Sequence, residues 1–169
     1  RHLATLRFAY ATFKIEGVSR VCSHQIVRHP HLSFLQRSQR YCKEHEPPVI
    51  IPESIAASNT RSVYATAIRM STRAYEDLIA AGVRKEDARF VLPQGASTEL
   101  YITGNLQAWH DFLVRRLDKH AQWEARLVAT MIYGYLRNVA PNIFNETSLG
   151  VSDTEIYDIE EKPTSAIDA

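Results

Sequence analysis

Hydrophobic and polar residues alternate along residues 5–16, which is the spacing of a β-strand. Leu6, Phe8 and Tyr10 fall on one side of this segment, and the opposite side is also largely apolar. Strands that are apolar on both sides are usually covered on both faces, so we expect this one to lie inside a layered structure. We expect Gly17 to end it.

A short helix is predicted for residues 18–28, where apolar and polar positions recur three and four residues apart. Pro30 cannot lie within a helix and favours extended geometry at His29, so the helix should end near Arg28. Its core face would consist of Val18, Val21 and Cys22, and its other face would carry His24, Gln25 and Arg28.

The middle of the chain predicts an extended segment followed by one long helix. Residues 33–42 should be extended, and residues 49–51 should form a short strand after a proline-containing loop. Ser58 is suited to cap a helix that runs to Ala81, with Gly82 at its carboxyl end. The buried stripe of this helix would consist of Val63, Ala67, Met70, Ala74, Leu78 and Ile79.

The carboxyl-terminal half predicts one more strand between helices. Residues 85–91 should form a short helix, and residues 98–103 should form the strand. Asn105 should cap a helix that ends near residue 119, and residues 122–139 should form the last helix. Strands and helices mixed in this way predict an α+β protein.

Composition predicts a globular protein with one core. The chain has 169 residues, of which 45% are hydrophobic and 23% charged, and it has neither an apolar run of about 20 residues nor a secretory signal. We therefore expect a cytoplasmic protein with one domain over residues 1–150. Residues 151–169 hold six carboxylates against Lys162 alone, which indicates a flexible acidic tail. Cys22 and Cys42 are interpreted as reduced thiols rather than a disulfide or metal site.

Positive charge is concentrated between residues 28 and 40. This run holds three arginines and two histidines, and no carboxylate occurs between Gly17 and Lys43, although the net charge of the chain is only +1. Such a concentration is unfavourable unless an anion binds to it, and phosphate is well matched to guanidinium donors. The run therefore predicts a binding site for a phosphorylated molecule.

Two arginines elsewhere raise the same possibility. Helical spacing places Asn105, Arg116 and two aromatic residues on one stripe, where a charged group is costly unless it is paired. In the simpler interpretation Asn105 is only a helix cap and Arg116 extends to solvent. Arg89 lies in an apolar helix and could equally pair with Glu86 or Asp87. Together with the basic run, both arginines suggest one pocket that collects guanidinium groups.

The side chains of the basic run do not form a recognisable catalytic group. Ser38 lies between Arg37 and Arg40 and is better suited to donate a hydrogen bond to phosphate than to act as a nucleophile. His29 and His31 are a weak metal signal without a third ligand. No glycine-rich nucleotide motif is present. A site with many anion donors and no reactive side chain fits a reaction that a bound cofactor performs.

Four collinear blocks of the sequence resemble the flavin-dependent thymidylate synthases over residues 1–139. The first block matches the family pattern of Arg-His-Arg, seven residues and then Ser-x-Arg, with no gap between Arg28 and Ser38 or Arg40. It consists of Ser19-Arg20, Gln25, Arg28-His29 and Ser38-Gln39-Arg40-Tyr41. The others are residues 88–93, Thr103-Gly104-Asn105, and Arg116 together with residues 120–124.

The resemblance implies an antiparallel sheet flanked by helices and a homotetramer with active sites between subunits. It implies conversion of deoxyuridylate to thymidylate, with methylenetetrahydrofolate as carbon donor and FAD, reduced by NADPH, as hydride source. The implied substrate-binding residues are Gln25, Gln36, Ser38, Gln39, Arg40, Arg89 and Arg116. The implied flavin-binding residues are His2, Arg28, His29, Thr98 and Asn105. Arg116 and Ser38 would be the candidate catalytic residues, with Arg116 stabilising negative charge on the pyrimidine. No metal, membrane or nucleic acid is implied.

The sequence departs from the family pattern at several positions. Pro30 replaces the second arginine of Arg-His-Arg, and Arg7-Phe8 replaces a Glu-His pair, whereas His2 is retained. Asp111 stands where members often have Asn or His. About fifty residues that usually precede His2 are not in this sequence, so flavin affinity and activity are less firmly implied than the fold.

Two alternatives follow from these departures and from the basic run. The first is a family-fold protein that binds deoxyuridylate but has lost catalysis. The second is a phosphate- or RNA-binding module in which Phe34, Tyr41 and Tyr10 form a stacking surface. The second alternative predicts affinity that falls with salt concentration and no flavin chromophore.

Overall fold

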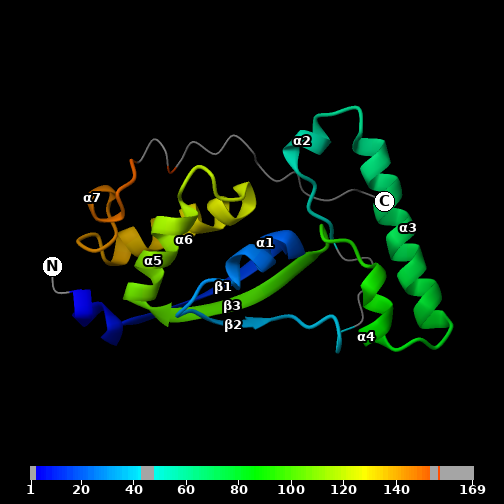
Figure 1. The fold of residues 1–169 in the computed structure, drawn as a ribbon, viewed down its shortest axis with the longest axis horizontal. Helices are drawn as coiled ribbons and strands as arrows, with labels where there is room; N and C mark the ends of the chain where they lie inside the picture. The colour runs from blue at the N-terminus through cyan, green and yellow to red at the C-terminus, as the bar shows by residue number, and fades with distance from the viewer. Residues whose placement is uncertain (1–2, 43–47, 153–155, 157–169) are drawn as a thin grey trace. The chain divides into compact units, whose positions relative to one another are not determined.

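The computed structural model describes residues 3–42, 48–152 and 156. These residues form a mixed fold of helices and one three-stranded sheet, so the predicted α+β class is confirmed (Figure 1). The elements in chain order are η1 (Leu3–Phe8), β1 (Tyr10–Ser19), α1 (Arg20–Ile26), β2 (Ser33–Gln36), α2 (Glu53–Ala56), α3 (Arg61–Ala80), α4 (Lys85–Ala88), η2 (Arg89–Val91), β3 (Ser97–Asn105), α5 (Leu106–Arg116), α6 (Trp123–Val139) and α7 (Glu146–Leu149).

The sheet has the strand order β1-β3-β2, with β3 in the centre. The hydroxyls of Thr12 and Thr103 lie 2.7 Å apart, and Lys14 lies over the ring of Tyr101, so residue numbers rise along β1 as they fall along β3. The sheet is therefore antiparallel, as expected. No helix among the described residues is long and apolar enough to cross a membrane.

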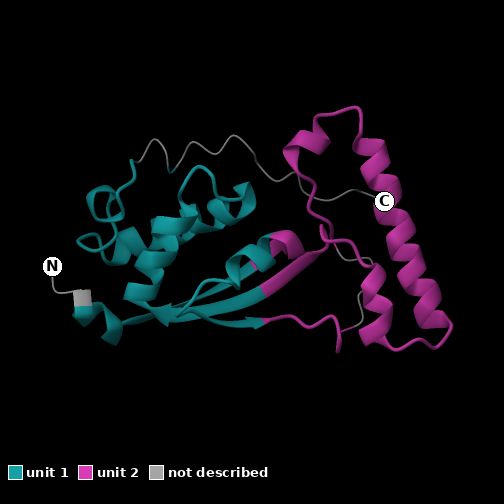
Figure 2. Cartoon of the chain, in the orientation of Figure 1, with its two compact units in different colours: residues 1–15, 22–35, 100–160 teal, residues 16–21, 36–99, 161–169 magenta. Residues whose placement is uncertain are grey.

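The chain divides into two compact units (Figure 2). Unit 1 comprises residues 1–15, 22–35 and 100–160, and unit 2 comprises residues 16–21, 36–99 and 161–169. Each of the three strands contributes residues to both units. The single domain predicted over residues 1–150 and the acidic tail stay predictions.

The core of unit 1 is built on an aromatic cluster. The fully buried Trp109 of α5 meets the rings of Phe13 and Phe112 edge to face, with centroids 5.0 and 5.5 Å away. Its indole Nε1 donates a hydrogen bond of 3.0 Å to the carbonyl of Ala11 on β1. This cluster fixes α5 against the strand because it joins geometrically specific ring contacts to a satisfied polar group. Helix α5 also packs on η1, α6 and α7.

Unit 2 is organised by α3, which packs on α2, α4 and η2. The hydroxyl of Tyr64 on this helix donates to the carbonyl of Ile50 at 2.9 Å. Gly95 lies so close to this contact that a Cβ on it would collide with the Tyr64 hydroxyl. The position therefore needs glycine for space rather than for an unusual backbone conformation.

The first strand is shifted from its predicted place. Residues 5–8 belong to η1, and β1 begins at Tyr10 and continues through Gly17 to Ser19. Gly17 has a φ of 71°, a left-handed conformation that glycine adopts without strain, so the strand continues where the sequence predicted its end. Helix α1 is accordingly shorter than predicted. It buries Cys22 as expected, but Val21 is exposed.

Two extended segments are shorter than predicted. Only Ser33–Gln36 of residues 33–42 is strand, and residues 39–41 form a turn. Residues 49–51 form no strand, and Val49 makes an isolated antiparallel bridge with Ala96. Single backbone hydrogen bonds still tie this region to β3 and to the residues before it: the N–H of Arg37 donates to the Glu99 carbonyl at 3.0 Å, and the N–H of Ile50 donates to the Gly95 carbonyl at 2.9 Å.

The long helix differs from prediction in its start and in its burial. Helix α3 begins at Arg61 with Thr60 at its N-cap position, rather than at Ser58, and ends at Ala80. Its only buried residue is Tyr75, which the predicted stripe omitted. Val63 and Met70 of that stripe are 68% and 69% exposed, so the apolar periodicity does not mark a face buried within this chain.

The helices of the carboxyl-terminal half agree with the prediction. Asn105 is the N-cap of α5, and α6 begins directly after Gln122. The short α7 was not predicted; it starts with a capping box of Asn145 and Ser148 and ends at Gly150 in the left-handed conformation. Beyond it, Ile156 is buried and its carbonyl accepts from the Thr130 hydroxyl at 3.1 Å. Most of the predicted tail lies outside the described residues.

We predict that Trp109→Phe lowers the free energy of unfolding by about 1–3 kcal/mol, because it leaves a cavity and removes the donor for the Ala11 carbonyl. Urea denaturation followed by circular dichroism measures this change. Trp123→Phe, at the half-buried start of α6, is the matched control and should change stability by less than about 0.5 kcal/mol. Equal effects of the two substitutions would contradict the role given to the aromatic cluster.

Candidate functional site

Helix α5 brings predicted site residues to the edge of the core of unit 1. Its N-cap Asn105 accepts a hydrogen bond from the backbone N–H of Ala108 at 2.9 Å through Oδ1. Its last residue is Arg116, and Trp109 and Phe112 between them are fully buried. The predicted stripe is therefore confirmed: Asn105 and Arg116 lie at its two ends, and the buried aromatic residues lie between them.

Arg116 is partly withdrawn from water. Its Nη2 donates a short hydrogen bond of 2.6 Å to the carbonyl of Gln25 on α1. Its Nε is buried and has no hydrogen-bond partner among the residues that the structure describes. Burial, helped by the charge of Arg115, lowers the pKa of Arg116, although a guanidinium stays protonated at pH 7. The expectation that Arg116 extends freely to solvent is wrong.

Cys22 lies close enough to Arg116 for each to influence the pKa of the other. Its thiol is buried, and burial raises its pKa far above the ordinary value, with a further increase from the charge of Glu124. The charge of Arg116 acts in the opposite direction and is the weaker influence. Cys22 is therefore an inert thiol. Neither cysteine forms a disulfide within the described residues, in agreement with the interpretation as reduced thiols.

His29 is a buried imidazole beside α5. Its side chain is only 4% exposed, and its ring meets Phe112 edge to face at 5.4 Å. Neither ring nitrogen has a well-formed hydrogen bond within the described part of the chain, although the backbone of Ala108 lies near enough to favour the protonated form. Burial outweighs this and, with Arg115 and Arg116, lowers the pKa of His29. The ring is neutral at pH 7 and carries two nitrogens that a ligand could bind.

The turn after His29 separates the two histidines. His31 has a φ of 68°, the left-handed conformation that non-glycine residues rarely adopt, and its side chain is exposed. Gly104 of β3 lies against the turn, where a Cβ would collide with the side chain of Leu32. His29 is buried and His31 is exposed, so the two imidazoles lie in different surroundings. Arg28 is also exposed.

In unit 2, the predicted phosphate-binding residues form a tight turn after β2. The Oγ of Ser38 accepts from the backbone N–H of Arg40 at 3.2 Å, and the N–H of Cys42 donates to the carbonyl of Ser38 at 3.0 Å. This use of Ser38 Oγ as an acceptor leaves its proton for donation to a ligand. Lys85 of α4 donates to the Tyr41 carbonyl at 3.1 Å and thereby fixes the turn.

Two arginines of unit 2 meet at Glu86. Arg40 Nε donates to the Glu86 Oε2 at 2.8 Å. Arg89 Nε donates to the backbone carbonyl of the same residue at 3.1 Å. The interpretation of Arg89 as one member of an ion pair is therefore wrong within the described residues: a carbonyl holds it, and the Glu86 carboxylate binds Arg40 and Arg84 instead.

The remaining predicted residues of unit 2 lie on β2 and β3 or close to them. Gln36 Nε2 donates to the hydroxyl of the buried Thr98 at 3.3 Å, across neighbouring strands. Gln39 is also buried, with 9% of its surface exposed. These polar groups are held inside the fold rather than spread over its surface.

The basic run is less unbalanced than its sequence suggested. Glu86 pairs with Arg40, and a Glu99 oxygen lies 4.0 Å from Arg37, so carboxylates distant in the chain supply part of the missing negative charge. Arg37, Glu99 and Arg40 are each more than a third exposed, so solvent screens these pairs and each adds little to the stability of the fold. A phosphate could displace or join them.

The predicted residues fall into two groups, one in each unit. Unit 1 holds Gln25, Arg28, His29, Asn105 and Arg116, and unit 2 holds Gln36, Ser38, Gln39, Arg40, Arg89 and Thr98. His2 lies outside the described residues. The single pocket expected to collect all the guanidinium groups stays a prediction.

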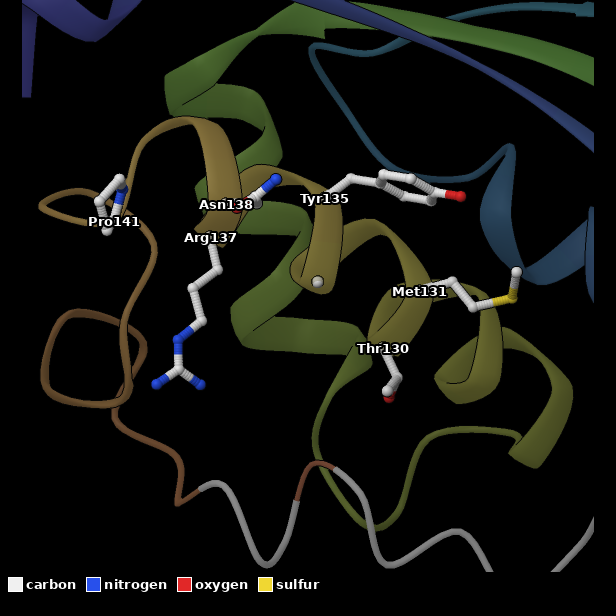
Figure 3. A pocket seen from close by; sticks show the side chains of 7 residues that line it. Thr130, Met131, Tyr135, Arg137, Asn138 and Pro141 are labelled. Carbon is white, nitrogen blue, oxygen red and sulfur yellow. The ribbon is translucent and has the colours of Figure 1, made fainter.

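An open pocket lies along α6 in unit 1 (Figure 3). It has a volume of about 860 Å³ and is wide open to solvent. Its lining residues are Thr130, Met131, Gly134, Tyr135, Arg137, Asn138 and Pro141. None of the predicted site residues lines it, so we assign the candidate site on the polar groups described above and not on this cavity.

Comparison with known proteins gives a consistent result. A sequence model of the thymidylate synthase complementing proteins matches residues 1–142. A flavin-dependent thymidylate synthase of Geobacter sulfurreducens is 40% identical over 152 residues, which cover 88% of this chain and 66% of that protein. One from Thermococcus onnurineus is 42% identical over 138 residues, covering 79% and 56%, and one from Mycobacteroides abscessus is 33% identical over 161 residues, covering 86% and 64%. The chain thus spans less than two thirds of the length of these relatives.

We predict that the stability of the protein falls as the pH drops through the unfolded-state pKa of histidine, about 6.5. The folded state holds the pKa of His29 below that value, so only the unfolded chain takes up this proton, and unfolding is favoured as the pH decreases. Urea denaturation at pH 7.5 and 5.5 measures the effect, which should be smaller in His29→Asn. His24→Asn, at an exposed position, is the control for the loss of an imidazole as such.

Proposed function

The chain belongs to the family of thymidylate synthase complementing proteins, and from this premise we propose that the protein converts deoxyuridylate to thymidylate. Methylenetetrahydrofolate would be the carbon donor, and FAD reduced by NADPH would supply the hydride. The observation that supports the proposal most directly is the match over residues 1–142, which includes the run from Arg28 to Arg40.

The groups available in unit 1 fit a flavin nucleotide. FAD carries pyrophosphate oxygens and a ring system rich in hydrogen-bonding atoms, and His29 offers two buried ring nitrogens that lack well-formed hydrogen bonds within the described residues. A neutral imidazole can donate from one nitrogen and accept at the other. Arg28 would meet a phosphate, and Asn105 would use its amide NH₂, because its Oδ1 already caps α5. We assign Thr98 and His2 to the same cofactor by position in the family.

The turn in unit 2 fits a nucleotide monophosphate. Ser38 has a hydroxyl proton to donate, and Arg40 and Arg89 each carry a guanidinium whose Nε alone is bound by the protein among the contacts described. Their terminal nitrogens are suited to phosphate oxygens, because planar N–H groups match the geometry of the anion. Gln36, Gln39, Gln25 and Arg116 would complete the deoxyuridylate site.

The residues of this chain would bind and polarise the substrate rather than form a bond to it. Arg116 would stabilise negative charge that develops on the pyrimidine ring, since it is a cation partly removed from water. Ser38 would hold the phosphate as a hydrogen-bond donor. Cys22 takes no part, because its buried thiol does not ionise at neutral pH.

We also propose that the protein acts as a homotetramer whose active sites lie between subunits. The two groups of site residues belong to different units of the chain. In an assembly with shared sites, each site can draw them from different copies. Light scattering of the purified protein measures the expected mass of four chains.

A second candidate is a protein of this family that binds deoxyuridylate without methylating it. Pro30 replaces a cationic residue of the family motif, and the turn that follows holds His31 in a left-handed conformation. One phosphate or flavin contact is therefore missing at this turn. The two candidates differ in whether the nucleotide is turned over.

We expect the purified protein, after addition of FAD, to show a flavin absorbance band that NADPH bleaches under anaerobic conditions. With deoxyuridylate labelled by tritium at the 5-position and with methylenetetrahydrofolate, it should release tritium to water. Nucleotide binding without tritium release would favour the second candidate. Absence of both flavin and nucleotide binding would contradict both.

We further predict that Arg116→Ala lowers turnover about 100-fold or more while it changes FAD content little, because a preorganised positive charge acts mainly on the reacting ring. Arg115→Ala is the matched control, since Arg115 is the exposed neighbour with the same charge. It should reduce turnover much less. Flavin content by absorbance and turnover by tritium release give the two measurements, and an equal loss of both in Arg116→Ala would refute this division of roles.

A further inference from the structure

One carboxylate of α4 connects two arginines of unit 2. Glu86 binds Arg40 Nε with Oε2 at 2.8 Å and Arg84 Nη1 with Oε1 at 3.0 Å. Its side chain is 27% exposed, whereas those of Arg40 and Arg84 are 54% and 76% exposed. Glu86 is therefore the most enclosed member of this group, and both of its oxygens are engaged.

The contact with Arg40 leaves one edge of its guanidinium available. Glu86 binds the Nε of Arg40, and the terminal nitrogens of Arg40 have no hydrogen-bond partner among the described residues. The ring of Tyr41 lies 5.4 Å from the guanidinium carbon and restricts the plane further. The outer edge, with its two parallel N–H groups, is the one that binds a phosphate in a bidentate manner.

Arg89 is held by Glu86 in the same way. Its Nε donates to the Glu86 backbone carbonyl at 3.1 Å, so again the protein binds the guanidinium through Nε. Arg40 depends on the side chain of Glu86, and Arg89 depends on its main chain. A substitution of Glu86 therefore affects Arg40 without affecting Arg89, because it removes the side-chain partner of Arg40 and leaves the backbone carbonyl that binds Arg89.

We propose that Glu86 is a positioning residue that fixes Arg40 for the phosphate of the nucleotide. The inference rests on the proposed function, which supplies deoxyuridylate as the ligand. A free arginine side chain loses rotamer freedom when it binds a ligand, and a side chain already held in place loses less. Arg84 keeps Glu86 in position, because it binds the oxygen that Arg40 does not use.

The charge of Glu86 alone would have the opposite effect on the affinity for phosphate. Glu86 is an anion next to a proposed phosphate site, so if it acted only through its charge, its removal would strengthen the binding of an anion. If Glu86 instead orients Arg40, its removal weakens binding. The sign of the change in affinity therefore distinguishes the two roles.

The test compares Glu86→Gln with Asp87→Asn by titration calorimetry of deoxyuridylate with the whole protein. Both substitutions remove one negative charge from α4, but Asp87 is bound only by Arg84, at 3.5 Å, among the described residues. We expect Glu86→Gln to weaken deoxyuridylate binding about tenfold, the loss typical of a disturbed charge-assisted hydrogen bond. Asp87→Asn should change it by less than about twofold. Deoxyuridine, which lacks the phosphate, should bind equally to all three proteins.

A double-mutant cycle assigns the effect to Arg40. In an Arg40→Gln background, Glu86→Gln should cause no further loss, whereas in an Arg89→Gln background it should still weaken binding about tenfold. The Nε–H resonance of Arg40 in ¹⁵N-arginine-labelled protein reports the contact directly, and it should shift in Glu86→Gln but not in Asp87→Asn.

Equal or tighter deoxyuridylate binding by Glu86→Gln, or an undiminished loss in the Arg40→Gln background, would overturn the positioning role while leaving the proposed function intact. If the wild-type protein binds no deoxyuridylate, the proposed function fails, and with it the consequence assigned to Glu86. The Arg40 resonance would then still show whether the ion pair exists.

Discussion

The stripe of α5 from Asn105 to Arg116 is the constraint on which unit 1 depends. Its middle buries Trp109 against β1 and Phe112 beside His29, and the helix cannot do so without bringing its two polar ends to the edge of the same core. Asn105 is thereby committed to capping and Arg116 to the carbonyl of Gln25. Packing of the aromatic side chains and placement of the polar groups are consequences of one helical periodicity.

Local signals predicted this helix well because the interactions that decide it are local. The cap at Asn105 involves Ala108, three residues away, and the stripe follows from spacing alone. The start of β1 at Tyr10 and its continuation beyond Gly17 could not be predicted in the same way. Glycine weakens a strand in the general case, but pairing with β3 determines whether the strand continues, and that pairing joins residues about ninety positions apart.

The ion pairs of the arginines likewise depend on residues that are distant in sequence, so the sequence alone could not predict them. The sequence allowed an ion pair of Arg89 with Glu86 or Asp87, yet the Glu86 carboxylate binds Arg84 and also Arg40, which lies 46 positions earlier in the chain. Part of the charge imbalance of the carboxylate-free run likewise disappears because Glu86 and Glu99, which are distant in sequence, pair with Arg40 and Arg37. For α3, periodicity indicated an apolar stripe correctly, but it contains no information on whether the same chain covers that stripe.

The contrast between the two thiols has a practical use. Cys22 is buried beside Glu124 and resists ionisation, whereas Cys42 is half-buried at the end of the Ser38 turn. Alkylating reagents attack thiolates that they can reach, so a maleimide dye would attach to Cys42 in preference to Cys22. Of the two cysteines in these 169 residues, Cys42 is thus the one suited to carry a fluorophore, next to the turn of Ser38 and Arg40.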